Sequence, residues 1–215
     1  MTWDGKQSIW YLGSGDSYYC TDAISNPEEC FKVLQQEITY LPREELTFKI
    51  YGKCFVLPRD KQFYGDIGSD GIVPLYRYSG NYIPRLNDWA PCLKEMRDIL
   101  HQSTDQYCNH AVVNRYLNGS DNIGYHRDKD RDFVENSSVL TLSFGQERIF
   151  TLKDNSRNIT QKIILQPGSL MILGPKTNTE WKHSIPKTKT AKNTRISITF
   201  RSIKTRYNPR TKQIL

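Results

Sequence analysis

The second half of this sequence consists of short runs of strand-forming residues with turn residues between them. These runs span residues 110–117, 139–144, 148–152, 162–165, 170–173 and 194–203. Six or more short strands at this spacing predict a β-sandwich or jelly roll. The chain has 215 residues, enough to bury a real core, and it contains no internal repeat or linker. We therefore expect a single domain that covers residues 1–215.

The first half adds helices and hairpins to this β-rich region. Residues 26–41 predict an amphipathic helix, because Asn26 can cap it and Pro27 suits the first helical position. A second helix is predicted from about residue 88 to residue 101 or 102. Between these helices, the glycines and prolines of residues 46–86 leave room only for short strands or hairpins. The predicted fold class is therefore α+β and mainly β.

Charge is distributed unevenly along the chain. The net charge is +7, and the stretch from Lys176 to the C-terminus contains eleven lysines and arginines with a single acid, Glu180. This stretch carries +10, and the residues before it carry −3. Such an asymmetry indicates a polyanion partner, although a solvated charged tail would have the same composition.

Other features of the composition bear on the compartment. No apolar run reaches the roughly 18 residues of a membrane span, and the first residues do not have the pattern of a signal peptide. The five cysteines form no CxxC pair, which favours a reducing compartment over a disulfide framework or a zinc site. We expect an intracellular monomer, nuclear or cytoplasmic.

One predicted strand has a polar face that demands an explanation. Arg195, Ser197, Thr199 and Arg201 alternate with apolar residues within residues 194–203, so these four side chains point to one side. An exterior strand with a solvated face would give the same pattern. Alternatively, the two arginines line a pocket for a dianion, because guanidinium matches carboxylate geometry.

A second feature is a candidate metal site. His126 and Asp128 stand two residues apart, so on an extended segment both side chains reach one cation. Together with His183 they would supply the two imidazoles and one carboxylate of a non-haem iron(II) triad. We interpret His101 and His110 as structural. Asn114 and Tyr116, also two apart, could bind a ligand of the same iron.

These residues resemble one known family, the AlkB-type iron(II)- and 2-oxoglutarate-dependent dioxygenases, and especially the branch that repairs duplex DNA. The resemblance covers roughly residues 25–203 and rests on motifs that follow the family's order and spacing. They are Tyr51-Gly52-Lys53, Pro58-Arg59, Tyr64-Gly65-Asp66, Tyr76 to Gly80, Asn114-Arg115-Tyr116, His126-Arg127-Asp128, Ser143-Phe144-Gly145, Pro167 to Leu170, Trp181 to Pro186 and Arg195 to Arg201.

The resemblance implies a fold, cofactors and a reaction. The fold would be a double-stranded β-helix, or jelly roll, in residues 108–203. Residues 25–107 would form an N-terminal extension with nucleotide-recognition hairpins, and residues 204–215 a basic tail. The cofactor would be Fe(II), with 2-oxoglutarate and O2 as cosubstrates. Hydroxylation of an N-methyl group on 1-methyladenine or 3-methylcytosine would release formaldehyde, with succinate and CO2 as coproducts.

The resemblance also implies individual roles. The metal ligands would be His126, Asp128 and His183, and the 2-oxoglutarate ligands Asn114, Tyr116, Arg195, Thr199 and Arg201. The substrate contacts would be Tyr51, Gly52, Lys53, Tyr76, Arg77, Tyr78, Lys129 and Asp130. In these roles Tyr51 would wedge into the base stack, and Tyr76 and Tyr78 would line the base pocket, although each aromatic ring could instead serve packing.

One departure from the family pattern concerns the substrate. Duplex-repair relatives tend to carry two acids after the HxD motif, whereas this chain has Lys129 and then Asp130. A lysine ammonium cannot accept a hydrogen bond from the base's exocyclic amine, although Asp130 can. Lys129 could face a phosphate instead.

The expected substrate is alkylated DNA, double-stranded and also single-stranded. Three alternatives stay open: the same chemistry on methylated RNA, a nucleic-acid-binding module with an inactive metal site, and a hydroxylase of proteins or small molecules.

Overall fold

Two antiparallel sheets form the body of the molecule. The computed structural model describes residues 8–50, 53–77 and 85–215. The larger sheet has seven strands in the order β1-β2-β12-β9-β14-β7-β5, and the smaller has four in the order β11-β10-β13-β8. Their strands are β1 (Ile9–Leu12), β2 (Ser17–Cys20), β5 (Asp60–Gly65), β7 (His110–Tyr116), β8 (Ile123–His126), β9 (Val139–Gly145), β10 (Arg148–Asp154), β11 (Ile159–Leu165), β12 (Leu170–Leu173), β13 (Lys182–Ile185) and β14 (Arg195–Arg201).

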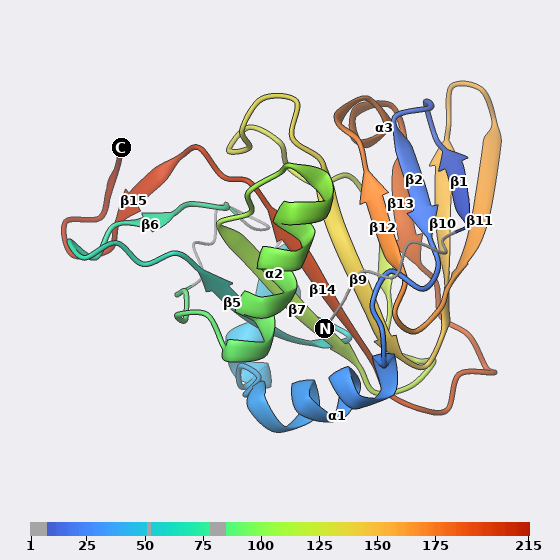
Figure 1. The fold of residues 1–215 in the computed structure, drawn as a ribbon, viewed down its shortest axis with the longest axis horizontal. Coiled ribbons are helices and arrows are strands. Elements are labelled where there is room, and N and C mark those ends of the chain that lie inside the picture. Colours follow the sequence, from blue (N-terminus) through green and yellow to red (C-terminus); the bar gives the residue numbers. More distant parts are fainter. Residues whose placement is uncertain (1–7, 51–52, 78–84) are drawn as a thin grey trace.

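Shorter elements lie around the two sheets. Figure 1 shows α1 and α2 along one side of the larger sheet, and β6 and β15 projecting at one end of the molecule. The remaining elements are α1 (Pro27–Glu37), a 3-10 turn (Arg43–Leu46), β3 (Thr47–Ile50), β4 (Lys53–Val56), β6 (Val73–Pro74), α2 (Pro91–Thr104), α3 (Pro175–Glu180), β15 (Arg206–Asn208) and β16 (Gln213–Ile214). Strands β3 and β4 form a separate hairpin, and β16, β15 and β6 form a small third sheet.

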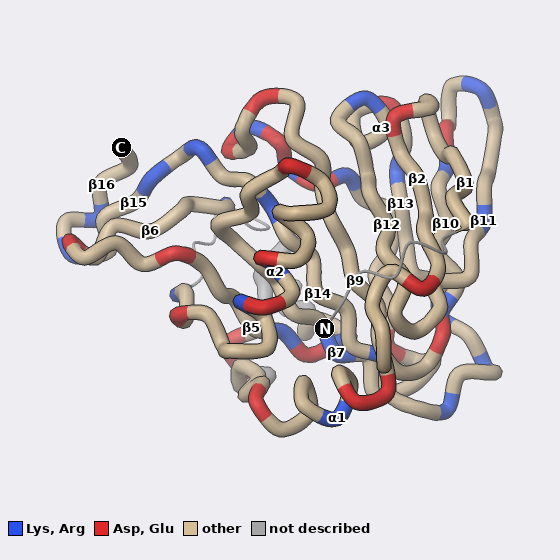
Figure 2. The backbone as a smooth tube through the Cα atoms, viewed as in Figure 1, with Lys and Arg blue, Asp and Glu red and all other residues tan. Residues whose placement is uncertain are grey.

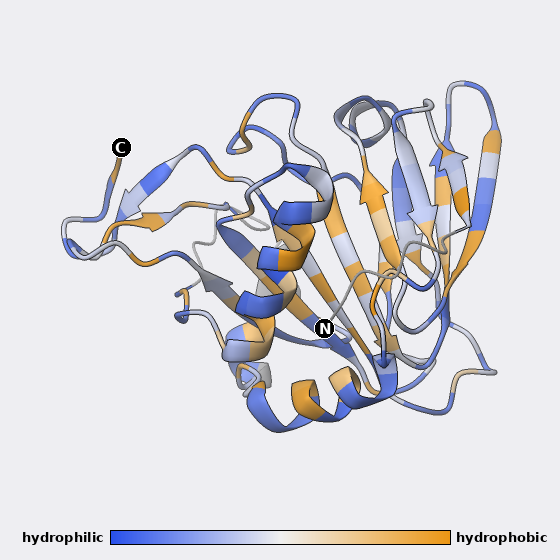
Figure 3. Cartoon of the chain, in the orientation of Figure 1, coloured by the Kyte–Doolittle hydropathy of each residue, from blue (hydrophilic) through white to orange (hydrophobic). Residues whose placement is uncertain are grey.

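Hydrophobic and hydrophilic residues alternate along the central strands (Figure 3), and the buried apolar residues form two clusters. One layer packs the helices against the outer face of the larger sheet, with Leu34 and Met96 meeting Ile196, Ile198 and Phe200. The other layer lies between the sheets. Burial of large apolar side chains in both layers supplies the main stabilisation, at about 1.5–3 kcal/mol for each. The polar face of β14 therefore points between the sheets and not into solvent.

Both predicted helices form, with different ends. Asn26 precedes α1 in the left-handed conformation (φ 53°), which asparagine tolerates, and its side chain makes no capping hydrogen bond. Its backbone oxygen instead accepts hydrogen bonds from Glu29 and Cys30. The helix stops at Glu37, short of the predicted residue 41, and α2 begins at Pro91 and runs on to Thr104. Helix ends depend on local hydrogen bonds that periodicity does not encode.

The predicted strands also form, but the sheets extend beyond residues 108–203. Strands β1, β2 and β5 come from the first 65 residues and complete the larger sheet. Residues 204–215, expected as a basic tail, contain β15 and β16, and Tyr207 of β15 pairs with Val73 of β6. Figure 2 shows basic positions along this end of the chain.

Two observations concern the expected compartment. Cys20, Cys30, Cys92 and Cys108 are buried free thiols, as the lack of a disulfide pattern in the sequence predicted. Within the described ranges, no helix combines the length and the apolar character that crossing a membrane requires.

His110 makes the stability of the fold depend on pH. It begins β7, is fully buried, and neither ring nitrogen has a hydrogen-bond partner in the described part of the chain. Burial, with a smaller effect of Arg201, lowers the pKa of His110 from 6.5 to about 3. Between these values the unfolded chain binds a proton that the folded chain excludes. The free energy of unfolding should therefore fall as pH decreases below about 6.5, by up to about 1.4 kcal/mol per pH unit.

The variant His110→Phe tests this expectation. It removes the titratable group but keeps an aromatic ring beside Tyr76, whose ring centroid lies 5.5 Å from that of His110. Urea unfolding between pH 7 and pH 4 should show a shallower pH dependence in the variant, by about one proton. An identical slope in both proteins would contradict a neutral His110.

Candidate active site

A cavity of about 460 Å³ lies between the two sheets. It is lined by His126, Asp128 and His183, and by the four polar residues of β14. Arg195, Ser197 and Arg201 are buried and Thr199 is half-buried, which excludes the interpretation of this strand as a solvated exterior face.

The predicted metal ligands come from two paired strands and the loop after one of them. His126 ends β8, and its backbone pairs directly with that of His183 on β13. The two rings lie 4.2 Å apart between centroids, and Asp128 follows two residues after His126. One ligand atom of each residue lies within 4.8 Å of the others. His101 and His110, interpreted as structural, do not belong to this group.

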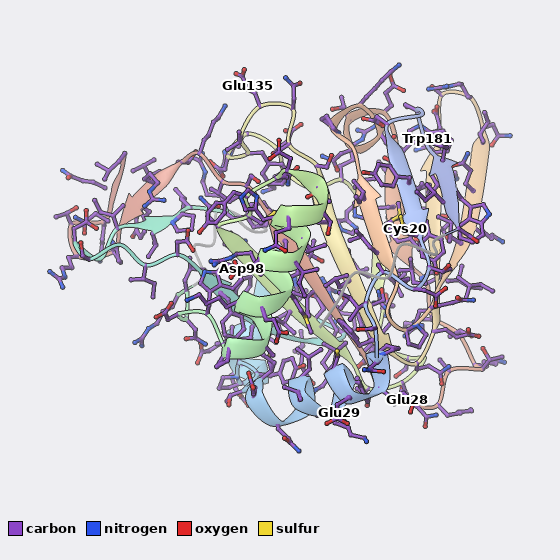
Figure 4. All side chains as sticks on the ribbon, in the orientation of Figure 1. Cys20, Glu28, Glu29, Asp98, Glu135 and Trp181 are labelled. Atoms are coloured by element: carbon purple, nitrogen blue, oxygen red, sulfur yellow. The ribbon has the colours of Figure 1, made fainter. Side chains whose placement is uncertain are left out.

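Helix α3 connects the two segments that carry the ligands. Asn178 of α3 accepts a hydrogen bond from the backbone N–H of Asp128 and donates one to its carbonyl, both at 2.9 Å. Arg127 donates to the carbonyl oxygens of Glu180 and Trp181, immediately before β13. Trp181, labelled in Figure 4, is buried and donates from its indole Nε1 to Ser14. These bonds fix the HxD segment relative to His183.

The protonation states of the triad suit metal binding. Burial lowers the pKa of His183 to about 3, with a further effect of His126, and burial also lowers the pKa of His126. Burial alone would raise the pKa of Asp128, but Arg201, followed by His183 and His126, brings it well below its usual value. Nδ1 of His126 donates to the carbonyl of Gly124 at 2.9 Å, which leaves Nε2 with its lone pair. Two neutral imidazoles and an ionised carboxylate are the donor set that iron(II) requires.

Arg201 and Arg195 occupy opposite ends of β14. Arg201 donates from Nη2 to Asp128 Oδ2 at 3.0 Å, beside the metal ligands. Arg195, only 2% exposed, donates from Nη2 to Ser143, but its Nε and Nη1 find no acceptor among the described residues. A buried guanidinium without an anion is costly, and burial lowers the pKa of Arg195 to about 10. Arg195 therefore offers a site for a carboxylate brought by a ligand.

The other predicted 2-oxoglutarate ligands line the same cavity. The Asn114 side chain lies on β7 and accepts a hydrogen bond from Arg59 at 3.2 Å. The Tyr116 ring lies 5.2 Å below the Arg195 guanidinium, and Thr199 pairs with Thr141 through their hydroxyls at 3.3 Å. The structure brings all five predicted residues together, although their binding of 2-oxoglutarate stays a prediction.

Arg59 and Lys61 line the cavity but had no assigned role in the sequence analysis. Arg59 precedes β5, and Lys61 lies on β5 directly opposite Asn114. Both are buried, and burial, with Arg59 and Arg201 nearby, lowers the pKa of Lys61 well below its usual value. All six residues of β5 are buried, so its polar residues do not alternate with exposed ones. The sequence carried no periodic signal that could have identified them.

The predicted substrate contacts are placed only in part. Tyr76, Arg77 and Lys129 line the cavity, whereas Asp130 is exposed and does not belong to its lining. Lys53 lies on the backbone of β4. Tyr51, Gly52 and Tyr78 fall outside the described residues. Contacts of all these residues with a base stay predictions.

The fold and the site define an Fe(II)- and 2-oxoglutarate-dependent oxygenase. The chain belongs to the 2OG-Fe(II) oxygenase superfamily, whose family model matches residues 19–201. A mouse protein named DNA oxidative demethylase ALKBH2 is 36% identical over 185 residues, which cover 82% of this chain and 74% of that protein. The human protein of the same name is 33% identical over 195 residues, covering 87% and 72%. Within its superfamily the chain is an AlkB-type dioxygenase, as the sequence motifs predicted.

A structural comparison agrees on the fold. The solved structure described as "The structure of OsALKBH1" aligns with a TM-score of 0.61 at 17% identity, covering 90% of this chain and 100% of the other. At this identity the likeness concerns the fold alone, and it confirms the predicted jelly roll. The family implies Fe(II), 2-oxoglutarate and O2. The triad fits the metal, and the unpaired nitrogens of Arg195 fit a carboxylate.

Arg195 yields a prediction about the cosubstrate. Arg195→Lys keeps the charge but loses the planar pair of donors. Since a charged hydrogen bond contributes about 1.5–3 kcal/mol, the apparent KM for 2-oxoglutarate should rise about tenfold or more. Succinate formation at varied 2-oxoglutarate concentration measures this change.

The matched control is Arg115→Lys. Arg115 makes a similar two-nitrogen contact with Asp60, at 2.9 and 2.8 Å, but lies outside the cavity lining. Equal KM values for 2-oxoglutarate in Arg195→Lys and the parent would contradict this role of Arg195. Arg201 would then be the next candidate for binding the carboxylate.

Proposed function

We propose that this protein repairs alkylated DNA by oxidative demethylation of 1-methyladenine and 3-methylcytosine. The observation that carries the proposal is one cavity lined by the candidate metal triad, by Tyr76, and by Arg195, whose Nε and Nη1 have no hydrogen-bond partner among the described residues. The named activity of the mouse and human relatives supports DNA as the substrate. An intracellular site, nuclear or cytoplasmic, and a monomeric state belong to the same proposal.

The roles of the chain's own residues follow from this geometry. His126, Asp128 and His183 would hold Fe(II), which with 2-oxoglutarate and O2 supplies the oxidising power for hydroxylation of a methyl group. Arg195 would bind the carboxylate of 2-oxoglutarate that lies farther from the metal. Arg201 keeps Asp128 ionised and in place. Buried apolar side chains such as Leu165 and Met171 line part of the cavity and would limit the access of water there.

The chemistry accounts for every atom. One oxygen atom of O2 enters the C–H bond of the N-methyl group, and the other enters succinate as the 2-oxo acid loses CO2. The hydroxyl group of the hydroxymethyl then gives up its proton, the C–N bond breaks with its electron pair staying on the base nitrogen, and formaldehyde leaves. A methyl on the pairing edge weakens base pairing, so flipping such a base costs less than flipping a normal one.

Surface charge supports a polyanion partner, with one adjustment. Two of the eleven basic residues that follow residue 175, Arg195 and Arg201, face the cavity and not the solvent. Lys187, Lys189 and Lys192 are exposed on the loop between β13 and β14. Contacts of these lysines with phosphates would strengthen binding to any nucleic acid.

The decisive experiment uses oligonucleotides that carry 1-methyladenine or 3-methylcytosine as duplex DNA, single-stranded DNA and single-stranded RNA. Each is incubated with the protein, Fe(II), ascorbate and 2-oxoglutarate, and mass spectrometry follows the loss of one CH2 unit. Asp128→Ala serves as the inactive control. Demethylation of RNA in preference to both DNAs would favour the RNA alternative. Succinate formation without demethylation of any of the three would favour a protein or small-molecule hydroxylase, and no succinate at all would favour a binding module.

Tyr51, proposed as the wedge that fills the gap left by the flipped base, gives a further prediction. Stacking of an aromatic side chain on a base contributes about 1–3 kcal/mol. Tyr51→Ala should therefore lose about tenfold or more in kcat/KM on duplex DNA, and much less on single strands, where the stack need not be opened. Tyr51→Phe should behave as the parent on both. Equal losses for Tyr51→Ala on both substrates would contradict the wedge.

A further inference from the structure

Arg77 and Asp132 form a buried ion pair beside the cavity. The Asp132 side chain is 0% exposed and that of Arg77 is 22% exposed. The Asp132 carboxylate accepts hydrogen bonds from the backbone N–H of Arg77 at 3.3 Å, from its Nε at 3.0 Å, and from its Nη2. Two nitrogens of the Arg77 guanidinium thus donate to one carboxylate, a directional contact that a lysine cannot reproduce.

Asp132 lies where three segments of the chain meet. It follows the metal ligand Asp128 by four residues, in the loop that continues past Glu135 toward β9 (Figure 4). Its carbonyl accepts a hydrogen bond from Lys204 at 2.9 Å, in the connection between β14 and β15. Through Arg77 it also holds the segment that leaves β6. One carboxylate therefore connects the metal-bearing loop to a segment that lines the cavity.

The residue held most directly by this arrangement is Tyr76, the neighbour of Arg77. Its ring is 5% exposed, lies 5.7 Å from the ring of Phe133, and sits under the Arg201 guanidinium at 4.6 Å. Its hydroxyl approaches Oδ1 of Asp128 at 3.5 Å. Tyr76 thus contacts the loop of the metal ligands on both sides of Asp132, and its position depends on where that loop is held.

We propose that the Arg77–Asp132 ion pair positions the methylated base indirectly. The pair fixes the Tyr76 ring relative to the loop that carries Asp128, and the ring in turn holds the base so that its methyl group faces the metal site in one orientation. The inference rests on the proposed function. Arg77 acts through Tyr76 and not by touching the base, because its guanidinium is already engaged by Asp132.

The variants Arg77→Lys and Asp132→Asn test the inference. The KM for the methylated oligonucleotide should rise about tenfold, as expected for the loss of one charged hydrogen bond. The KM for 2-oxoglutarate and the affinity for Mn(II), measured without O2, should stay at the parental values. A base held out of register should also leave part of the 2-oxoglutarate oxidation uncoupled. Formaldehyde per succinate should then fall below the parental ratio, with ascorbate supplying the missing electrons.

A matched control is Asp154→Asn in the hairpin of β10 and β11. Its carboxylate is also buried and forms an ion pair with Arg157, with 2.6 Å between Oδ2 and Nε, but it does not line the cavity. This variant should keep the parental coupling ratio. The double variant Arg77→Lys/Asp132→Asn should be no worse than the more severe single variant, because the two residues act as one unit.

Where Asp132→Asn fails to fold, Arg77→Lys alone decides. A parental ratio of formaldehyde to succinate and a parental KM in folded Arg77→Lys would overturn the inference. An equal rise of the KM for 2-oxoglutarate would also overturn it, since the pair would then support the whole site. A parent protein that demethylates no nucleic acid would overturn the proposed function and this inference together.

Discussion

The active-site architecture depends on charge compensation along a single strand. Strand β14 lies between β7 and β9, so each of its residues faces either the helices or the cavity. The apolar residues of β14 pack on the side of the helices, so Arg195 and Arg201 of the same strand face the cavity. Burying a guanidinium costs free energy unless an anion or several hydrogen-bond acceptors compensate its charge. Asp128 pairs with Arg201, whereas Nε and Nη1 of Arg195 have no hydrogen-bond partner among the described residues. This difference distinguishes the end of the cavity that carries the metal triad from the other end, where we propose that 2-oxoglutarate binds.

The position of Asp128 depends on hydrogen bonds to its backbone, because this metal ligand does not lie on a strand. Two of the three stand on neighbouring strands, but Asp128 lies beyond the end of β8 and would be mobile without further support. Asn178 fixes its peptide group from both sides, and Arg127 ties the same segment to the start of β13. Such outer contacts keep a carboxylate at the correct distance before a metal arrives. The short helix α3, which precedes β13, thereby links the segment of Asp128 to the strand of His183.

The net charge of a segment does not show which of its charged residues are on the surface. A surplus of +10 after residue 175 indicated a polyanion partner, but it counts interior and surface groups alike. Arg195 and Arg201 are buried at the cavity, while Lys187, Lys189 and Lys192 are exposed to solvent. The same residue types therefore lie in two settings, and in the proposed function the buried arginines serve the cavity while the exposed lysines contact a phosphate backbone.

The sequence by itself determined the metal triad, the alternation of β14 and the jelly roll, because each of these rests on local spacing or on a motif. Two-residue spacing fixes which side chains share a face whatever the strand pairs with. It could not indicate Arg59, Asn178 or Asp132, whose partners lie 50 or 55 residues away in the chain. Buried polar residues of this kind leave no periodic pattern, because a hydrogen bond to a partner distant in the sequence offsets the free-energy cost of their burial. Only the tertiary structure, which brings those partners within hydrogen-bonding distance, decided their roles.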